Sequence, residues 1–244
     1  MTVLTDAMGQ LFYSISVAMG IMITYGSYVK KETNLIKSVN QIEIFDSAVA
    51  FLAGLMIVPA VYTFSGTEGM ASGPSLMFVS LPKVFGEMGI TGHIVGVVFF
   101  VTVAFAALTS SVSILEIFTP NVMELSKGKV SRKKASIIGS IICMVLGIPV
   151  SFSFGMWGDV RILGMDIFSL YDNLICIVIY PLIALVTAIM VGWIWGKDKA
   201  INAISNGGEL NRGVNKLWFF DVKFICPILL AVVVYTGIAG FLGI

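Results

Sequence analysis

Hydrophobic positions in this chain gather in blocks that are long enough to cross a membrane, and short polar segments separate them. A helix spans the hydrocarbon core of a bilayer with about 20 mostly apolar residues. Six stretches reach that length, so the pattern predicts an all-α transmembrane protein with about six membrane helices. These predicted spans cover residues 7–28, 44–64, 91–116, 134–153, 167–195 and 218–243.

The first predicted span contains polar groups that an unbroken, lipid-facing helix does not need. Ser14, Ser16 and Gly20 lie near its middle. A polar group exposed to hydrocarbon costs free energy, whereas the freed carbonyl and N–H groups of a broken helix can bind a cation or an anionic substrate group. We therefore expect this helix to be interrupted near the bilayer midplane. The alternative is that the serine hydroxyls bond back to carbonyls of their own helix or pack between helices.

The composition agrees with a multi-pass membrane protein, since 57% of the residues are hydrophobic and only 12% are charged. A net charge of +1 gives no sign of a nucleic-acid partner. If the loops alternate across the membrane, 13 of the 15 basic residues fall on one side. Cytoplasmic loops carry the Lys and Arg excess, so we expect the basic loops to be cytoplasmic and the first span to run from outside to inside. These basic residues are Lys30, Lys31, Lys37, Lys127, Lys129, Arg132, Lys133, Lys134, Lys197, Lys199, Arg212, Lys216 and Lys223.

The external segment at about 65–90 is long for a loop and still apolar. Its second half predicts a short amphipathic helix over 75–86, capped by Ser75. Two interpretations are open: the segment folds back onto the protein as a lid, or its helix lies passively at the membrane interface. The polar loops at 117–133 and 196–217 are predicted to lie on the cytoplasmic side, with Gly207 and Gly208 as a flexible turn.

Two further polar groups lie at membrane depth. Asp46 stands at the start of the second predicted span, where it either has a functional partner or caps the helix. The third span contains the run Ala106-Ala-Leu-Thr-Ser-Ser-Val-Ser113, with four hydroxyls in five residues. Hard cations such as sodium prefer oxygen ligands, and neutral hydroxyl and carbonyl oxygens supply them. The alternative for this run is packing of small polar residues between helices.

Asp172 lies near the outer end of the fifth predicted span. It either caps the long helix that follows or faces the outer vestibule as a gating charge. The sequence contains no catalytic triad and no phosphate-binding loop, so we do not expect an enzyme.

In their order and spacing, four segments resemble the neurotransmitter:sodium symporter family, and specifically its bacterial sodium-dependent amino-acid transporters. They are Gly9-Gln-Leu-Phe-Tyr-Ser-Ile-Ser with Thr24-Tyr-Gly-Ser-Tyr-Val, then Ala106-Ala-Leu-Thr-Ser-Ser, and Trp195-Gly-Lys-Asp-Lys-Ala. The resemblance covers essentially the whole chain. It implies a LeuT-like inverted-repeat fold, of which residues 1–195 form the second five-helix repeat. Residues 196–217 are then a cytoplasmic loop, and 218–244 an additional transmembrane helix.

The resemblance also implies a role for individual residues. The substrate-binding residues are Tyr13, Ser14, Ser16, Met19 and Gly20 in the unwound helix, together with Ser110 and Ile114. Ser14 and Asp46 bind one sodium ion, and Ala106, Thr109 and Ser110 bind a second. Asp172 belongs to the extracellular gate and Tyr28 to the cytoplasmic gate.

The function implied is sodium-coupled symport of a small amino acid across the bacterial inner membrane by alternating access. The first five helices of the family's fold are not in this sequence, so we expect the chain to need a separately encoded N-terminal half. The alternative is a truncated membrane fragment that does not transport. Besides such an N-terminal half, the expected partners are membrane lipid, sodium and a small amino acid, and no nucleic acid is expected.

Overall fold

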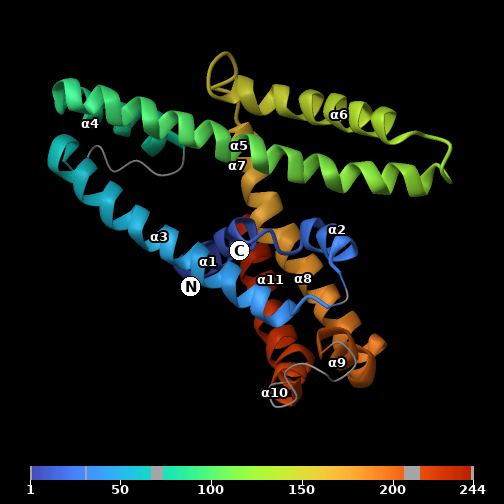
Figure 1. Ribbon diagram of the computed structural model, residues 1–244. Coiled ribbons are helices and arrows are strands. Elements are labelled where there is room, and N and C mark those ends of the chain that lie inside the picture. The colour runs from blue at the N-terminus through green and yellow to red at the C-terminus, as the bar shows by residue number, and fades with distance from the viewer. Residues whose placement is uncertain (1, 31, 67–73, 206–214, 243–244) are drawn as a thin grey trace. The chain divides into compact units, whose positions relative to one another are not determined.

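The computed structural model describes residues 2–30, 32–66, 74–205 and 215–242, and these residues form helices with no β-strand among them (Figure 1). The predicted first span is divided into α1 (Thr2–Ser14) and α2 (Ile21–Tyr28). The prediction of an all-α protein whose first membrane helix is broken is therefore confirmed. Five further helical stretches are long and apolar enough to cross a membrane, namely Leu35–Thr63, Gly89–Leu125, Arg132–Ser153, Ile167–Trp195 and Leu217–Phe241.

Two of these stretches, Ile167–Trp195 and Leu217–Phe241, change from α-helix to π-helix along their length. In a π-helix the backbone hydrogen bond spans five residues instead of four, and such turns are frequent at functional sites. The elements after α2 are α3 (Leu35–Ser65), the π-helix η2 (Leu76–Ser80), α4 (Leu81–Glu87), α5 (Gly89–Leu125), α6 (Arg132–Ser153), α7 (Ile167–Asp172), the π-helix η3 (Asn173–Ile179), α8 (Tyr180–Ile189), the π-helix η4 (Met190–Trp195), α9 (Lys197–Ser205), α10 (Asn215–Phe220), the π-helix η5 (Asp221–Ile225) and α11 (Cys226–Leu242).

The second membrane helix begins well before the apolar stretch from which it was predicted. Asn34 precedes α3, and its side-chain oxygen accepts a hydrogen bond of 3.0 Å from the backbone N–H of Lys37. An asparagine in this position satisfies one of the N–H groups that the first turn of a helix leaves without a partner. The predicted start at residue 44 is therefore wrong, and Asp46 lies inside α3 instead of at its cap.

The third membrane helix continues past its predicted end at residue 116. α5 runs through Pro120 to Leu125, so the expected loop over 117–133 is wrong in its first half. The helix ends where Lys127 and Gly128 take positive φ angles of 52° and 77°. The N–H of Gly128 donates to the carbonyl of Met123 and that of Lys127 to Glu124, both at 2.9 Å. This pair of bonds is a Schellman motif, which satisfies the last carbonyls of the helix.

The chain divides into two compact units, residues 41–113 and residues 1–40 with 114–244. In the unit of residues 41–113, the core consists of Val61 from α3 and Leu81 and Val84 from α4. Phe85 extends this core, since its ring lies 5.7 Å from that of Phe99 on α5. The described part of the predicted lid segment thus folds back onto α3 and α5. Its predicted Ser75 cap is wrong, because Ser75 has helical dihedral angles and makes no capping hydrogen bond.

In the other unit, α11 packs along α8 and η3, and α1 packs against η3 and α11 (Figure 1). Two glycines allow these close approaches. A Cβ atom on Gly9 would lie 3.2 Å from the carbonyl oxygen of Cys176, and one on Gly237 only 2.5 Å from that of Ile177. The π-helical turn η3 is therefore packed between two helices at positions without a side chain. The predicted Gly207–Gly208 turn lies outside the described residues.

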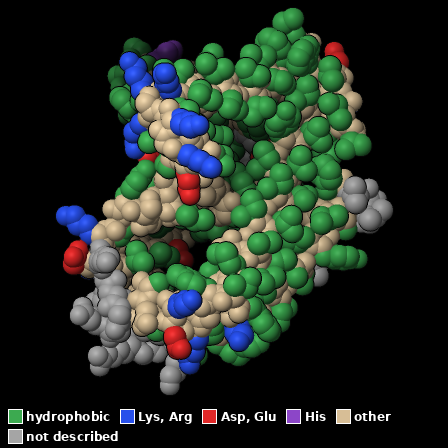
Figure 2. Space-filling view, turned by 90° about the vertical axis from the view of Figure 1, so that its right-hand side faces the viewer, with side chains coloured by type: hydrophobic (Ala, Val, Ile, Leu, Met, Phe, Trp, Pro, Cys, Tyr) green, Lys and Arg blue, Asp and Glu red, His purple; other side chains and the backbone are tan. Residues whose placement is uncertain are grey.

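Many large hydrophobic side chains are exposed, and they cover much of the face that Figure 2 shows. Ile23 and Tyr235, for example, are each 75% exposed, although both belong to apolar helices. A water-soluble protein does not leave so much continuous apolar surface uncovered. The surface is that of a multi-pass membrane protein, whose outer helix faces contact lipid or further transmembrane helices.

The close packing of α4 against α5 leads to a testable prediction. A Cβ atom on Gly92 would lie 1.9 Å from the backbone oxygen of Phe85 and 2.7 Å from Cβ of Met88. We expect Gly92→Ala to lower the free energy of unfolding by about 1–3 kcal/mol, as overpacking does. Gly54→Ala is the matched control, since a Cβ there meets nothing within 4 Å and alanine favours the helix. Thermal unfolding in detergent should separate the two variants, and equal stability of both would contradict the packing.

Candidate ion and substrate site

The interruption between α1 and α2 is a defined structure and not a gradual fraying. Ser16 has a φ of 56°, in the left-handed region. The N–H of Val17 donates to the carbonyl of Phe12 at 3.0 Å, and that of Ser16 to Tyr13 at 3.2 Å. These two bonds form a Schellman motif, so α1 is closed at Ser14 as a complete helix end. Glycine normally takes this left-handed position, and here serine takes it.

Beyond this helix end, the backbone has polar groups without backbone partners. The hydrogen bonds described for this segment give no backbone donor to the carbonyls of Val17, Ala18 and Met19. Ala18 and Gly20 also have positive φ angles, of 64° and 86°. α2 then begins at Ile21, and its first N–H groups have no preceding helical carbonyls to bond. The interruption thus offers both acceptors and donors, which suits a cation and an anionic group.

The interruption lies beside α5 in the same unit. A Cβ atom on Gly20 would lie 3.5 Å from Cγ2 of Ile117. Ile114, a predicted substrate residue, is one helical turn earlier on α5 and 42% exposed. Among the predicted residues of the first span, Tyr13 is 56% exposed, and Ser14, Ser16, Met19 and Gly20 are exposed or partly buried. These side chains are therefore accessible to a ligand.

The unit of residues 41–113 holds the predicted sodium ligands of α3 and α5. Asp46 lies within α3 and is partly buried. The hydroxyl of Thr109 donates to the carbonyl of Ala106 at 2.9 Å, which places two predicted ligand oxygens next to each other. Each oxygen keeps a lone pair for an ion. The hydroxyls of Ser111 and Ser113 donate in the same way to the carbonyls of Ala107 and Thr109, at 2.8 and 3.1 Å. Ser110 is exposed on the same helix.

Asp172 does not cap the helix that follows, so that alternative is wrong. Asp166 caps α7 instead: its carboxylate accepts from the backbone N–H of Ser169 at 3.0 Å and from the hydroxyl of Ser169 at 2.7 Å. Asp172 is the last residue of α7 and accepts a long contact of 3.4 Å from the Cys176 thiol. It therefore stands where the α-helix changes into the π-helix η3.

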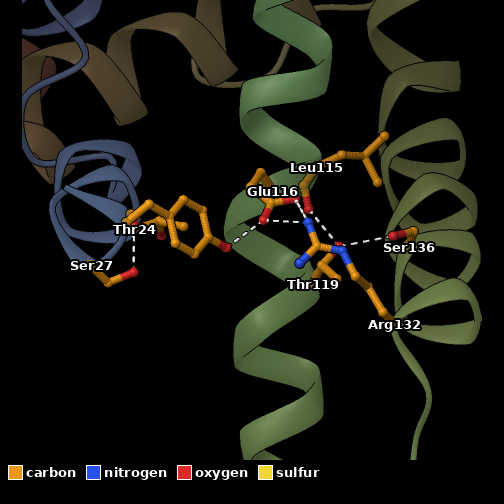
Figure 3. A network of polar contacts seen from close by, with 8 residues as sticks. Thr24, Ser27, Leu115, Glu116, Thr119, Arg132 and Ser136 are labelled. Atoms are coloured by element: carbon orange, nitrogen blue, oxygen red, sulfur yellow. Dashed lines mark hydrogen bonds and ion pairs between the residues drawn. The ribbon is translucent and has the colours of Figure 1, made fainter. Parts of the chain in front are cut away.

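Tyr28, the predicted cytoplasmic gate residue, belongs to a polar network with two residues that the sequence did not reveal (Figure 3). Its hydroxyl donates to the carboxylate of Glu116 on α5. The guanidinium of Arg132, at the start of α6, donates to both oxygens of the same carboxylate at 2.8 Å. Glu116 thereby joins the end of α2 to the start of α6. We call these three residues the Glu116 latch.

A second polar contact fixes α5 to α6 beside the latch. Thr119 is almost completely buried, and its hydroxyl lies 3.0 Å from that of Ser136 on α6 (Figure 3). Gly139 allows the helices to approach, because a Cβ there would lie 3.2 Å from Cβ of Phe118. The partners of the latch are therefore held by rigid packing as well as by charge.

Together these features define a multi-pass membrane protein with a broken helix, whose carbonyls at residues 17–19 receive no described backbone donor. A model of the Sodium:neurotransmitter symporter family matches residues 1–242, and the chain belongs to this family. It is a family of transporters, and sodium is its co-transported ion.

Relatives and a solved structure agree with this assignment. The chain is 32% identical over 237 residues to an uncharacterized sodium-dependent transporter, YhdH, of Bacillus subtilis, covering 97% of this chain and 51% of the relative. It is 35% identical over 232 residues to an uncharacterized sodium-dependent transporter of Haemophilus influenzae, covering 95% and 49%. The crystal structure of MhsT in complex with L-phenylalanine matches with a TM-score of 0.85 and 37% identity, over 96% of this chain and 51% of MhsT.

The chain thus spans about half the length of the curated relatives it matches. The LeuT-like fold expected from the sequence is confirmed by the likeness to MhsT. The individual substrate, sodium and gate residues stay predictions, because neither the likeness nor the backbone geometry tests what each side chain binds.

Sequence reasoning missed Glu116 and the role of Arg132. In the sequence, Arg132 is one of several basic residues in a predicted loop. Glu116 is the last residue of the predicted third span, and an ionisable residue at membrane depth is by default a functional candidate. The position of Glu116 within a predicted span is therefore the sequence signal that points to the latch. Its partners Tyr28 and Arg132 come from distant parts of the sequence, which composition does not connect.

The Asp166 cap leads to a prediction about acid stability. Hydrogen bonds from Ser169, first from its backbone N–H and then from its hydroxyl, lower the pKa of the Asp166 carboxyl. Its contribution is therefore present above the unfolded pKa, about 3.9, and is lost as the pH falls through the folded value. We expect Asp166→Ala to cost about 1 kcal/mol at pH 7 and less below that window, where the protonated carboxyl is only a neutral acceptor.

Thermal unfolding between pH 3 and 7 measures this effect. Asp166→Asn should keep most of the cap at both ends of the range, because an amide oxygen also accepts from the first turn. Asp159→Ala, on the exposed loop nearby, is the control and should change stability by less than about 0.5 kcal/mol. The same loss at pH 3 as at pH 7 in Asp166→Ala would contradict the assignment.

Proposed function

We propose that this chain forms part of a sodium-coupled amino-acid symporter that works by alternating access. The observation that carries the proposal is the interruption between α1 and α2, with its Schellman closure at Ser16 and its unpaired carbonyls at 17–19. Irregular backbone at membrane depth persists only where it is buried in protein or lines a polar cavity. A binding site at this point explains why the helix is broken there.

The two helix ends at the interruption match the two charged species in our proposal, the substrate carboxylate and the sodium ion. The N-terminus of α2 carries the positive end of its helix dipole and attracts a substrate carboxylate. The carbonyls at the end of α1 carry the negative end and attract a cation. Tyr13, Ser14, Ser16, Met19 and Gly20 are the residues through which this segment contacts the substrate in our proposal. Ser110 and Ile114 on α5 complete the substrate residues.

The sodium ligands that we propose on α5 are the carbonyl oxygen of Ala106 and the hydroxyl oxygens of Thr109 and Ser110. The 2.9 Å contact between Thr109 and Ala106 supports this, because it brings two oxygens within reach of one ion. Ser14 and Asp46 remain proposed sodium ligands on their own helices. Sodium binding at neutral oxygens stabilises the substrate-competent state without adding a second buried charge.

We propose an apolar amino acid as the substrate. Met19 and Ile114 give the proposed pocket apolar walls, and the MhsT structure, which this chain resembles, holds L-phenylalanine. L-phenylalanine is therefore the substrate to test first.

The Glu116 latch is our candidate for the cytoplasmic gate. It joins α2, which follows the interruption, to α6, so closing or opening it moves the backbone next to the proposed site. Asp172 is the proposed acidic residue of the extracellular gate. Basic loops on the cytoplasmic side of the cell membrane would place the latch at the cytoplasmic end.

The relatives contain about as many residues again as this chain, and we propose that transport requires helices corresponding to that other half. The decisive experiment is uptake of radiolabelled L-phenylalanine into proteoliposomes, driven by a sodium gradient. It should be observed when the chain is co-expressed with the N-terminal half of MhsT and be absent for the chain alone. Uptake that is equal in sodium and in potassium would reject sodium coupling.

The double variant Thr109→Ala, Ser110→Ala tests the sodium ligands in the assembled protein. Loss of two oxygens should raise the sodium concentration for half-maximal L-phenylalanine binding by about tenfold or more, since a charge-assisted contact contributes roughly 1.5–3 kcal/mol. Ser111→Ala is the matched control, because this substitution also removes a hydroxyl from α5 but Ser111 is not among the proposed ligands. Scintillation proximity binding across a sodium series measures both. Unchanged sodium dependence in the double variant would remove these residues from the site.

Glu116→Gln tests the latch by removing the ion pair while keeping an acceptor for Tyr28. Arg132 is 63% exposed, so we expect a shift of only about fivefold towards the cytoplasm-open state. The labelling rate of a cysteine introduced at Ser27, in a background without native cysteines, reports that state. Lys133→Gln, next to Arg132 but outside the latch, should leave the rate unchanged. A slower or unaltered rate in Glu116→Gln would contradict the gate.

A further inference from the structure

Lys223 is held by aromatic rings in the last membrane helix of the chain. Its Nζ atom lies 4.9 Å from the centre of the Trp193 ring, 5.5 Å from that of Phe224 and 6.0 Å from that of Phe219. A lysine ammonium within about 6 Å of an aromatic face is attracted by the negative face of the neutral ring's quadrupole. Trp193 comes from η4, and the other residues from α10 and η5. We call these four residues the Lys223 clasp.

The backbone around the clasp is fixed by a second contact. The indole N–H of Trp193 donates to the carbonyl oxygen of Lys223 at 3.1 Å. Gly192, which is buried, makes this possible, because a Cβ there would lie 2.9 Å from Cα of Lys223. Two π-helical segments, η4 and η5, therefore meet at the clasp without an intervening side chain. The position of the lysine is determined by the fold and not by chance contact of flexible side chains.

Lys223 has no acidic partner in the described part of the chain. The ion pair recorded among those residues joins Arg132 to Glu116. A lysine within a membrane helix is costly unless it is paired or reaches the interface. Aromatic rings attract the ammonium but do not neutralise it, so its N–H groups remain suited to an anion.

The clasp lies where two membrane helices end together. One span ends at Trp195 and the other begins at Leu217, so Trp193 and Lys223 lie close to the level of the lipid headgroups. α9 packs against η4 and α10 at this same end (Figure 1). Trp193 is 60% exposed and Phe224 41% exposed, so the clasp is open on its outer side. Tryptophan at this depth is typical of a membrane–water interface.

The charges around the clasp favour an anion. α9 adds the exposed Lys197 and Lys199, while Asp198 and Asp221 are the exposed acidic residues of α9 and η5. These five charged groups leave one net positive charge, and only Lys223 among them is held by rings. A phosphodiester that carries an acyl chain matches this arrangement. Its phosphate would contact the Lys223 ammonium, and its acyl chain would lie along the exposed side chains of Trp193 and Phe224.

We propose that the Lys223 clasp binds the headgroup of an anionic phospholipid in the leaflet at this end of the helices. The site is separate from the proposed transport residues, so the proposal does not depend on what the chain transports. Basic side chains at the cytoplasmic surface attract anionic lipids with about 1 kcal/mol each, and a fixed lysine turns that general attraction into a site.

Native mass spectrometry of the full 244-residue chain tests the proposal, with phosphatidylglycerol and phosphatidylcholine of the same acyl chains as probes. We expect phosphatidylglycerol to bind more tightly than phosphatidylcholine to the unaltered chain. Lys223→Gln should weaken phosphatidylglycerol binding about fivefold and leave phosphatidylcholine unchanged. Lys199→Gln, at the same end but outside the clasp, is the matched control. Its loss of phosphatidylglycerol affinity should be less than half of that in Lys223→Gln.

Two further variants keep the test decisive if Lys223→Gln disturbs the fold. Lys223→Arg keeps the charge and the ring contacts and should retain the preference for phosphatidylglycerol. Trp193→Phe removes the indole N–H and weakens the ring's attraction for the cation, and should reduce that preference. Equal binding of the two lipids by the unaltered chain would overturn the proposal. So would the same loss in Lys199→Gln as in Lys223→Gln, or a preference that survives in Lys223→Gln.

Discussion

Every backbone N–H and C=O group inside a bilayer needs a hydrogen-bond partner, because hydrocarbon offers none. Long continuous helices meet this constraint over most of the chain, as in α5 and α6. Departures from the continuous α-helix among the described membrane segments are the interruption at 15–20 and the π-helical turns. Each departure therefore needs a local reason, and those reasons locate the functional features of the molecule.

The departures are compensated in different ways. At η3, backbone carbonyls of Cys176 and Ile177 face Gly9 and Gly237, whose Cα–H groups can approach them closely. At η5, the carbonyl of Lys223 receives the indole N–H of Trp193. At residues 17–19, by contrast, the described backbone supplies no donor. This difference separates turns that serve packing from the segment that we assign to binding.

Much of the fold follows from sequence pattern because apolar blocks of bilayer length have few other solutions. The break near Ser14, Ser16 and Gly20 was predictable for the same reason, since those residues gain nothing on a lipid-facing helix. Helix ends were less predictable: α3 starts after its Asn34 cap, and α5 ends at Leu125, just before the left-handed Lys127, and both signals lie outside the apolar blocks. The π-helical turns depend on tertiary packing at glycines, and the Glu116 latch on residues far apart in sequence, so neither has a local signature.

The left-handed backbone at Ser16 and Ala18 has an energetic consequence for the broken helix. A residue with a side chain costs roughly 1–2 kcal/mol in that region compared with the right-handed form. The backbone of this segment is therefore strained, and an ion that binds to its carbonyls would offset part of the energetic cost. Ion occupancy and local chain order would then be linked as a thermodynamic pair, so that a loaded segment exchanges its amide hydrogens more slowly than an empty one.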